Sequence, residues 1–200
     1  MTDIIRRPYR PIDPLFLIRW SPRAFDGSAI PDGDLETLFE AARWSPSAFN
    51  YQPWRFLYAH RDSADWTRFL DLLVPFNGAW ASRAAVLLFL LSDKLVQSSP
   101  SGEPSPSHSH SFDTGAAWAL LALQATRMGY HAHAMTGVDF ERARTELDVP
   151  DRFQLEAAIA VGRMGDKSVL PEALQARELP SDRKPVQQFA FAGNFPAQPD

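Results

Sequence analysis

Two apolar segments in the middle of the chain place the strongest constraint on its fold. Residues 84–92 are almost continuously apolar, and such a segment indicates a strand that is buried on both faces in the middle of a sheet. Residues 113–128 form a helix-length segment with almost no polar side, and Gly129 follows it as a stop signal. A helix of this kind belongs in the core or in a dimer interface, because it must be covered on most sides.

Shorter periodic segments predict further helices and strands around these two. The other expected helices cover residues 13–19, 31–44, 63–73 and 139–147. Side chains that can cap a helix stand near the start of several helices, and the expected caps are Asp13, Ser63, Asp113 and Asp139. The other expected strands cover residues 54–60, 130–135 and 153–161. The pattern therefore predicts a mixed α and β protein.

Two segments lack the pattern of a packed element. Residues 97–111 contain seven serines and three prolines. This composition buries little apolar surface, so we expect a mobile surface loop there. Residues 165–200 are interrupted by prolines and are expected to form an extended tail that needs another surface to lie on. The length of 200 residues suits one domain.

Composition excludes several classes of protein. The net charge of -4 argues against nucleic acid as a partner, since such binding needs a basic face. The chain has no cysteine, which excludes disulfides and a catalytic thiolate and fits a cytoplasmic protein. Its apolar runs are far shorter than the roughly 20 residues that cross a bilayer, and no signal-peptide pattern opens the chain. We therefore expect neither a membrane span nor export.

Familiar catalytic motifs are missing from the sequence. There is no G-x-G-x-x-G after a strand, no Walker loop, no G-x-S-x-G and no H-E-x-x-H. Two histidine pairs, His108 with His110 and His131 with His133, have the spacing of neighbours on one strand face. Neither pair has a third ligand that the sequence can assign, so we expect no metal site.

Three polar clusters remain as candidate binding residues. Arg19, Ser21 and Arg23 offer two guanidinium forks and a hydroxyl, which could bind one phosphate or form a solvated basic turn. Residues 45–54 combine hydroxyls, carboxamides and aromatic rings that could bind a heteroaromatic ring, although an ordinary helix-to-strand turn has the same composition. Arg183 and Lys184 could add phosphate contacts or be solvated.

In their order along the chain, five short motifs resemble the nitroreductase family of FMN-dependent oxidoreductases, from about residue 12 to residue 195. They are R-x-S-x-R-x-F at 19–25, S-P-S-x-x-N-x-Q-P-W at 45–54, F-N-x-x-W at 76–80, D-T-G-A-A at 113–117 and R-K-P at 183–185. The resemblance implies an α+β fold, namely an α/β/α sandwich with a mostly antiparallel central sheet. It also implies an intertwined homodimer in which the tail at 165–200 wraps the partner subunit.

The same resemblance implies two FMN sites at the subunit interface and assigns residues to them. Arg19, Ser21 and Arg23 would hold the phosphate and ribityl chain or the pyrimidine edge. The loop that includes Pro46 and Asn50 would come from the other subunit. The full implied set of cofactor-binding residues is Arg19, Trp20, Ser21, Arg23, Pro46, Ser47, Ala48, Asn50, Gln52, Asn77, Met135, Thr136, Gly137, Arg183 and Lys184.

Two positions depart from the family pattern. Trp20 stands where many relatives carry another basic residue, and no acidic residue precedes Gly137, where many members place one near flavin N5. A backbone N–H of Thr136 or Gly137 could still contact that atom.

The implied reaction needs no catalytic side chain, because the flavin carries the chemistry. NAD(P)H would give a hydride to the flavin, and a small electron-poor acceptor such as a nitroaromatic or a quinone would then be reduced. Other functions stay open at this point. The chain could reduce or oxidise one dedicated metabolite, store or sense FMN without turnover, or act as a helical interaction protein that recruits partners.

Overall fold

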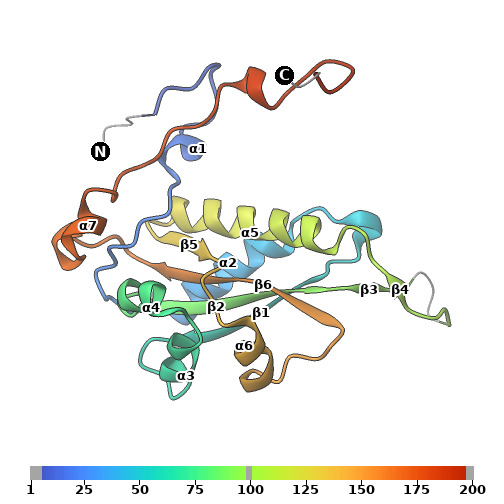
Figure 1. The fold of residues 1–200 in the computed structure, drawn as a ribbon, viewed down its shortest axis with the longest axis horizontal. Coiled ribbons are helices and arrows are strands. Elements are labelled where there is room, and N and C mark those ends of the chain that lie inside the picture. The colour runs from blue at the N-terminus through green and yellow to red at the C-terminus, as the bar shows by residue number, and fades with distance from the viewer. Residues whose placement is uncertain (1–5, 98–100, 197–200) are drawn as a thin grey trace.

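The computed structural model describes residues 6–97 and 101–196. A four-stranded antiparallel sheet lies in the middle of the molecule, in the order β1-β2-β6-β5. Figure 1 shows α5 running across one face of this sheet, while α3, α4 and α6 lie on the other. The result is an α/β/α sandwich with an antiparallel sheet, as the sequence predicts.

The sheet is built from four strands that are distant in sequence. They are β1 (Trp54–His60), β2 (Val86–Asp93), β5 (His131–Met135) and β6 (Phe153–Gly162). Every residue of β2 is buried, because this strand has a neighbour on each side and helices over both faces. In the register of the sheet, Phe89 of β2 lies opposite Leu57 of β1 and Ala158 of β6. The strands expected from the sequence are therefore confirmed.

Alternate residues of β2 supply the two halves of the core. Leu88 joins α2 (Asp32–Arg43) and α5 (His110–Arg127), whose Leu38 and Leu121 are fully buried. Phe89 points to the other side, where Phe69 of α3 (Trp66–Asp71) contacts its ring. The remaining helices on that side are α4 (Pro75–Ala81) and α6 (Phe140–Glu146).

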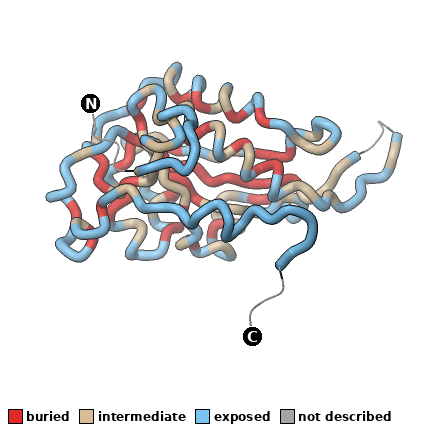
Figure 2. The backbone as a smooth tube through the Cα atoms, turned by 90° about the horizontal axis from the view of Figure 1, so that it is seen from above, coloured by how far each residue is buried: buried red, intermediate tan, exposed pale blue. Residues whose placement is uncertain are grey.

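Both ends of the chain extend away from the sandwich on the same side (Figure 1). The N-terminal end carries α1 (Pro14–Ile18). The C-terminal end carries η2 (Lys167–Val169), α7 (Glu172–Gln175) and η3 (Val186–Gln188). Residues 181–196 are exposed throughout, and Figure 2 shows this tail as a continuous exposed strip beside the buried sheet. Arg6 links the two ends, because its Nε donates to the carbonyl of Ser181 at 2.8 Å.

Two predicted helix caps are confirmed and two are wrong. The Asp13 carboxylate accepts from the Leu15 N–H, and the Asp139 carboxylate accepts from the Arg142 N–H. Ser63 lies in a turn, and α3 begins only at Trp66 after Asp65. Asp113 lies inside the first turn of α5, which begins at His110.

The segment expected as a loop at 97–111 contains more regular structure than predicted. β3 (Leu95–Val96) and β4 (Ser105–Pro106) form a short antiparallel pair across it. Its last two residues, 110 and 111, belong to the first turn of α5. Residues 98–100 lie outside the described residues. The mobility of the segment stays a prediction. Among the described residues, no helix combines the length and the hydropathy needed to cross a bilayer.

Candidate functional site

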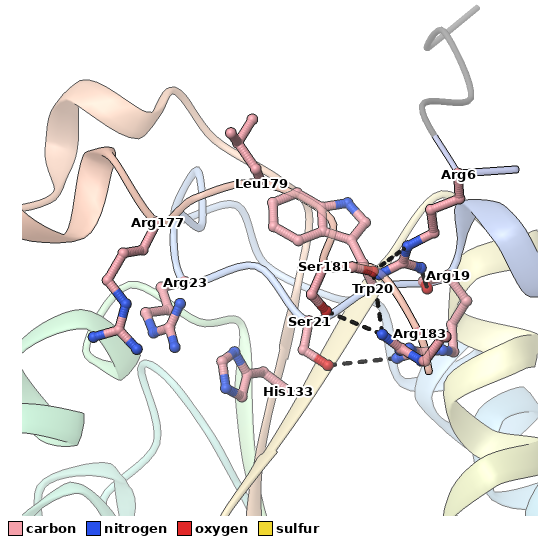
Figure 3. Close-up of a pocket in the computed structure, with 10 residues that line it drawn as sticks. All are labelled: Arg6, Arg19, Trp20, Ser21, Arg23, His133, Arg177, Leu179, Ser181 and Arg183. Atoms are coloured by element: carbon pink, nitrogen blue, oxygen red, sulfur yellow. Dashed lines mark hydrogen bonds between the residues drawn. The ribbon is translucent and has the colours of Figure 1, made fainter. Parts of the chain in front are cut away.

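A cavity of about 360 Å³ lies where the two ends of the chain meet the edge strand β5. Figure 3 shows side chains from the N-terminal segment, from β5 and from the C-terminal segment facing it. Its described lining residues are Arg6, Arg19, Trp20, Ser21, Arg23, His133, Arg177, Leu179, Ser181 and Arg183. Five of these ten residues are arginines and none carries a carboxylate. We refer to this space as the arginine cavity.

One side of the arginine cavity gathers Arg6, Arg19 and Arg183. Arg6 donates to the carbonyl of Arg19 at 2.7 Å, and Arg183 donates to the Ser181 hydroxyl at 3.0 Å. Arg19 donates to the Ser21 hydroxyl at 3.4 Å. Burial lowers the pKa of Arg19, and the nearby charges of Arg183 and Arg6 lower it further. Three cations held this close repel one another, so an anion bound between them would be strongly favoured.

The other side contains Arg23, which Glu178 holds in place. The buried Glu178 carboxylate accepts from the backbone N–H groups of Arg23 and Ala24, and Arg23 Nη1 lies 3.7 Å from Glu178 Oε2. One carboxylate therefore ties the N-terminal segment to the C-terminal segment. Arg177, the residue before it, faces the cavity near Arg23 (Figure 3).

Strand β5 forms the floor of the arginine cavity through His133. The imidazole packs against the Trp80 ring with centroids 4.6 Å apart, and its Nδ1 lies 2.9 Å from the carbonyl oxygen of Pro22. His131, two residues earlier, packs edge-on against Trp20 with centroids 6.2 Å apart. Within residues 6–97 and 101–196, no group of three or more side chains is arranged to hold a metal ion.

Beyond the end of β5, Gly137 and Asn77 meet at close range. Asn77 Nδ2 donates to the Gly137 carbonyl at 3.3 Å, and the same carbonyl accepts from the Val74 N–H at 3.0 Å. A Cβ at Gly137 would lie 2.2 Å from Asn77 Nδ2, so any larger residue here would displace the Asn77 amide. Thr136 is exposed beside it, whereas Met135 is buried. Gly137 is four residue steps from His133, a span of at most about 13 Å in extended backbone.

The loop at 45–54 has an unusual backbone. Phe49, Asn50 and Gln52 have φ angles of 48°, 59° and 51°. The left-handed region is costly for residues other than glycine, and such strain concentrates at functional sites. Two hydrogen bonds to side chains hold the loop: Ser47 Oγ accepts from the Gln52 N–H, and Asp113 Oδ2 accepts from the Ala48 N–H at 3.1 Å. The loop is therefore anchored to the first turn of α5.

The loop and the arginine cavity lie at opposite ends of α5 within one chain (Figure 1). An 18-residue helix is about 27 Å long. The structure thus brings together Arg19, Trp20, Ser21, Arg23 and Arg183, and it places Asn77, Met135, Thr136 and Gly137 further along the same edge. Within one chain, both groups lie far from the predicted loop residues, which are Pro46, Ser47, Ala48, Asn50 and Gln52.

A second, larger hollow of about 840 Å³ runs between the N-terminal segment and the tail. Lys184 lines this hollow and does not line the arginine cavity, whereas Arg183 lines both. Phe16 and Phe189 also line it, with 54% and 63% of their surface exposed. We refer to this space as the terminal groove.

Sequence reasoning missed five of the described lining residues of the arginine cavity, which are Arg6, His133, Arg177, Leu179 and Ser181. It also missed Glu178, which does not line the cavity but binds Arg23. Arg6 and Arg177 stand among other charged residues without a local motif. Glu178 would have been detectable only through its partners, which are 154 and 155 positions away. The i, i+2 spacing of His131 and His133 gave a signal, but it suggested a metal site and not a wall of this cavity.

Comparison with known proteins identifies relatives along most of the chain. The family model described as the nitroreductase family matches residues 18–163. A solved structure described as an oxidoreductase containing FMN is 51% identical, with a TM-score of 0.95, covering 99% of this chain and 100% of the other. A structure from Desulfovibrio desulfuricans in complex with FMN shares the fold at 23% identity, with a TM-score of 0.70, over 93% and 100% of the two chains.

Two curated relatives extend the comparison. An uncharacterised 15.4 kDa protein of Mycolicibacterium smegmatis is 33% identical over 138 residues, which are 67% of this chain and 88% of its own. A Thermus thermophilus protein named NADH dehydrogenase is 28% identical over 196 residues, covering 84% of this chain and 91% of its own.

Proposed function

Because the chain belongs to the nitroreductase family, we propose that it is an FMN-dependent oxidoreductase that takes a hydride from NAD(P)H and reduces small electron-poor acceptors. The 51% identity to an oxidoreductase containing FMN supports the choice of cofactor. The similarity to a protein named NADH dehydrogenase supports a nicotinamide donor. Nitroaromatics and quinones are the acceptor classes that the proposal names.

The arginine cavity is the observation that carries this proposal. A phosphate monoester has close to two negative charges at neutral pH and three acceptor oxygens. Arg19 and Arg183 offer guanidinium forks that match such a group, and the hydroxyls of Ser21 and Ser181 lie beside them. A ligand that carries a phosphate relieves the repulsion between these cations. The phosphate end of FMN fits this chemistry.

The edge that runs from His133 to Gly137 suits the remainder of the cofactor. Asn77 uses its Nδ2 on the Gly137 carbonyl, so its Oδ1 is the atom that would meet a donor on the pyrimidine edge. Gly137 allows the Asn77 amide to approach the backbone closely, because a Cβ at this position would collide with that amide. Arg23 would lie against the pyrimidine edge, where positive charge stabilises a flavin that gains electrons.

When it is bound, FMN supplies the hydride-accepting and hydride-donating chemistry. The residues of this chain bind and orient it, and the positive charge around Arg23 makes its reduction easier. No side chain of the described site has to act as a general acid or base.

We propose further that two chains complete each site. The strained loop at 45–54 carries polar groups suited to a flavin, but it lies at the far end of α5 from the arginine cavity of its own chain. A two-fold axis can bring the loop of one subunit to the cavity of the other. The exposed aromatic residues of the terminal groove support such a dimer, since an apolar surface of this kind is usually covered.

The first experiment is an absorbance spectrum of the purified protein after addition of FMN and desalting. Anaerobic NADPH and NADH are then added in turn. We expect a retained flavin spectrum that bleaches with at least one of the two donors. A retained spectrum that does not bleach would instead favour a storage or sensor module, and a folded protein that retains no flavin would contradict the proposal.

Site variants connect the spectrum to the residues. Arg19→Ala removes a charge-assisted contact of about 1.5–3 kcal/mol, so FMN should bind roughly 10- to 100-fold more weakly. Asn50→Ala tests the contribution of the loop in the same assay. Arg43→Ala is the matched control, because Arg43 pairs with Glu40 on the surface of α2 and lies outside the site. Equal FMN retention in all three variants would remove the site assignment.

The acceptor is tested separately. Catalytic efficiencies with nitroaromatics, quinones and a panel of metabolites are compared under the same conditions. Similar efficiencies across nitroaromatics and quinones support the proposal. A single metabolite preferred by orders of magnitude would show that the protein is a dedicated reductase or dehydrogenase.

A further inference from the structure

His133 is the one titratable side chain in the arginine cavity that is not an arginine among the described lining residues. Two contacts fix its ring: the Trp80 indole packs on it at 4.6 Å, and Nδ1 faces the Pro22 carbonyl at 2.9 Å. A carbonyl oxygen only accepts, so Nδ1 must carry a proton. Nε2 is therefore the nitrogen that can gain or lose a proton and the one left to meet a ligand.

The surroundings disfavour the protonated form of this imidazole before a ligand binds. Burial lowers the pKa of His133, and the charge of Arg23 lowers it further, while the carbonyls of Pro22 and Ser21 and the carboxylate of Glu178 act in the opposite direction. Arg177 adds another positive charge on the same side of the cavity (Figure 3). Strand β6, paired with β5, contributes the apolar Ala160 opposite His133.

We infer that His133 takes up a proton from solvent at Nε2 when a phosphate-bearing ligand binds in the arginine cavity, and that the imidazolium then donates to that ligand. The inference rests on the proposed function, because FMN is the ligand that the proposal places there. An arriving dianion offsets the arginine charges that oppose protonation, so the charged form becomes favourable. His133 then acts as a positioning residue that couples cofactor affinity to pH.

The sign of this coupling follows from linkage. The pKa of His133 is lowered in the free protein and is higher in the complex, so the complex binds more protons than the separate partners. Affinity therefore strengthens as pH falls from the pKa of the complex toward the pKa of the free protein, by at most tenfold per pH unit for one proton. The phosphate of the ligand has the opposite effect on the pH dependence of affinity. The arginines favour its dianionic form, so a monoanionic phosphate releases its proton on binding.

The test is isothermal titration calorimetry of FMN into the apoprotein at pH 6.0. It uses two phosphate-free buffers with different ionisation enthalpies, which give the number of protons taken up on binding. His133→Asn keeps a donor for the Pro22 carbonyl but cannot titrate, and His133→Gln places an amide nearer to Nε2. We expect the wild type to take up more protons than either variant, and both variants to bind FMN about 3- to 10-fold more weakly.

His131→Gln is the matched control. It removes a partly buried histidine from the same strand, and burial lowers the pKa of His131 as well, but the side chain does not line the arginine cavity. Its proton uptake should equal that of the wild type. Equal uptake in His133→Asn, His133→Gln and the wild type, or a loss of uptake only in His131→Gln, would overturn the inference.

The outcomes also separate this inference from the proposed function. Riboflavin, which lacks the phosphate, should bind more weakly than FMN and with less proton uptake by His133. FMN binding without a contribution from His133 overturns only the inference. A wild-type protein that binds neither FMN nor riboflavin overturns the proposed function as well.

Discussion

At the scale of single residues, Gly137 packs so closely against Asn77 and Val74 that even a Cβ would clash with them. Gly137→Ala would place a Cβ 2.2 Å from Asn77 Nδ2 and 2.9 Å from Val74 Cγ2. The Asn77 amide would have to move, so we expect a loss of about 1–3 kcal/mol in the free energy of unfolding. FMN retention should weaken too, because the displaced amide belongs to the proposed pyrimidine contact. Urea denaturation and flavin titration measure the two effects.

Gly33→Ala is the control for this substitution. Gly33 lies in the first turn of α2, and a Cβ there would meet no atom within 4 Å. We expect it to leave stability unchanged or to raise it by up to about 1 kcal/mol. Equal effects of the two substitutions would show that crowding at Asn77 has no energetic consequence.

The residues of the site differ in how far the sequence predicts them. Arg19, Ser21 and Arg23 stand close together in sequence, so their convergence in the arginine cavity is a local property that a motif can carry. Arg177 lines the same cavity from the far end of the chain, and its neighbour Glu178 pairs with Arg23. Only the packing of the two chain ends brings these residues near Arg23. No local pattern of charge or hydrophobicity in the sequence predicts that packing.

At the scale of elements, the start of α5 has a second role that its sequence hides. Asp113 is buried, and its carboxylate accepts from the Ser109 hydroxyl and from the Ala48 N–H. It therefore joins the helix to the strained loop at 45–54. We expect Asp113→Ala to cost about 1–3 kcal/mol and to increase hydrogen exchange at residues 45–52. FMN retention should fall with it, since the loop belongs to the proposed site.

Asp139→Ala separates loss of the loop anchor from loss of a helix cap. Asp139 caps α6, so its removal should cost about 0.5–2 kcal/mol without changing exchange at residues 45–52. Hydrogen exchange measured by mass spectrometry compares the two variants. Identical exchange in the loop of both would show that Asp113 does not anchor it.

The elements that the sequence predicts best are those with a strong hydrophobic period. All four strands of the main sheet are close to their predicted ranges, because burial imposes the pattern directly. The early start of α5 depends instead on tertiary contacts: Ser92 lies 2.7 Å from His110, and Ser111 donates to Glu156. α4 was not predicted as a helix, since it is only seven residues long.

At the scale of the whole molecule, the terminal groove makes the proposed dimer testable. Phe189→Asp places a charge on an exposed aromatic position of this groove. A charge in an apolar interface is strongly unfavourable, so we expect the molar mass measured by light scattering to fall from two chains to one. FMN should dissociate in parallel, because the loop at 45–54 would then be too far from the arginine cavity.

Val169→Asp provides the comparison for that variant. Val169 is also partly exposed, but it lies in η2 and does not line the terminal groove. We expect it to keep both the mass and the flavin of the wild type. A wild-type protein with the mass of one chain and bound FMN would contradict the two-chain site.

The meeting of the two chain ends also sets an order of events during synthesis. Arg6 bonds to Ser181 across 175 positions, and Arg183 lies in the same cavity. A ribosome releases the tail last, so the sandwich can fold on a nascent chain whose cavity is still missing one wall. The proposed loading of FMN would therefore follow translation. A chain that ends before Ser181 would keep its sheet and its α-helices but lose Ser181 and Arg183 from the cavity, so we expect it to bind the proposed cofactor more weakly.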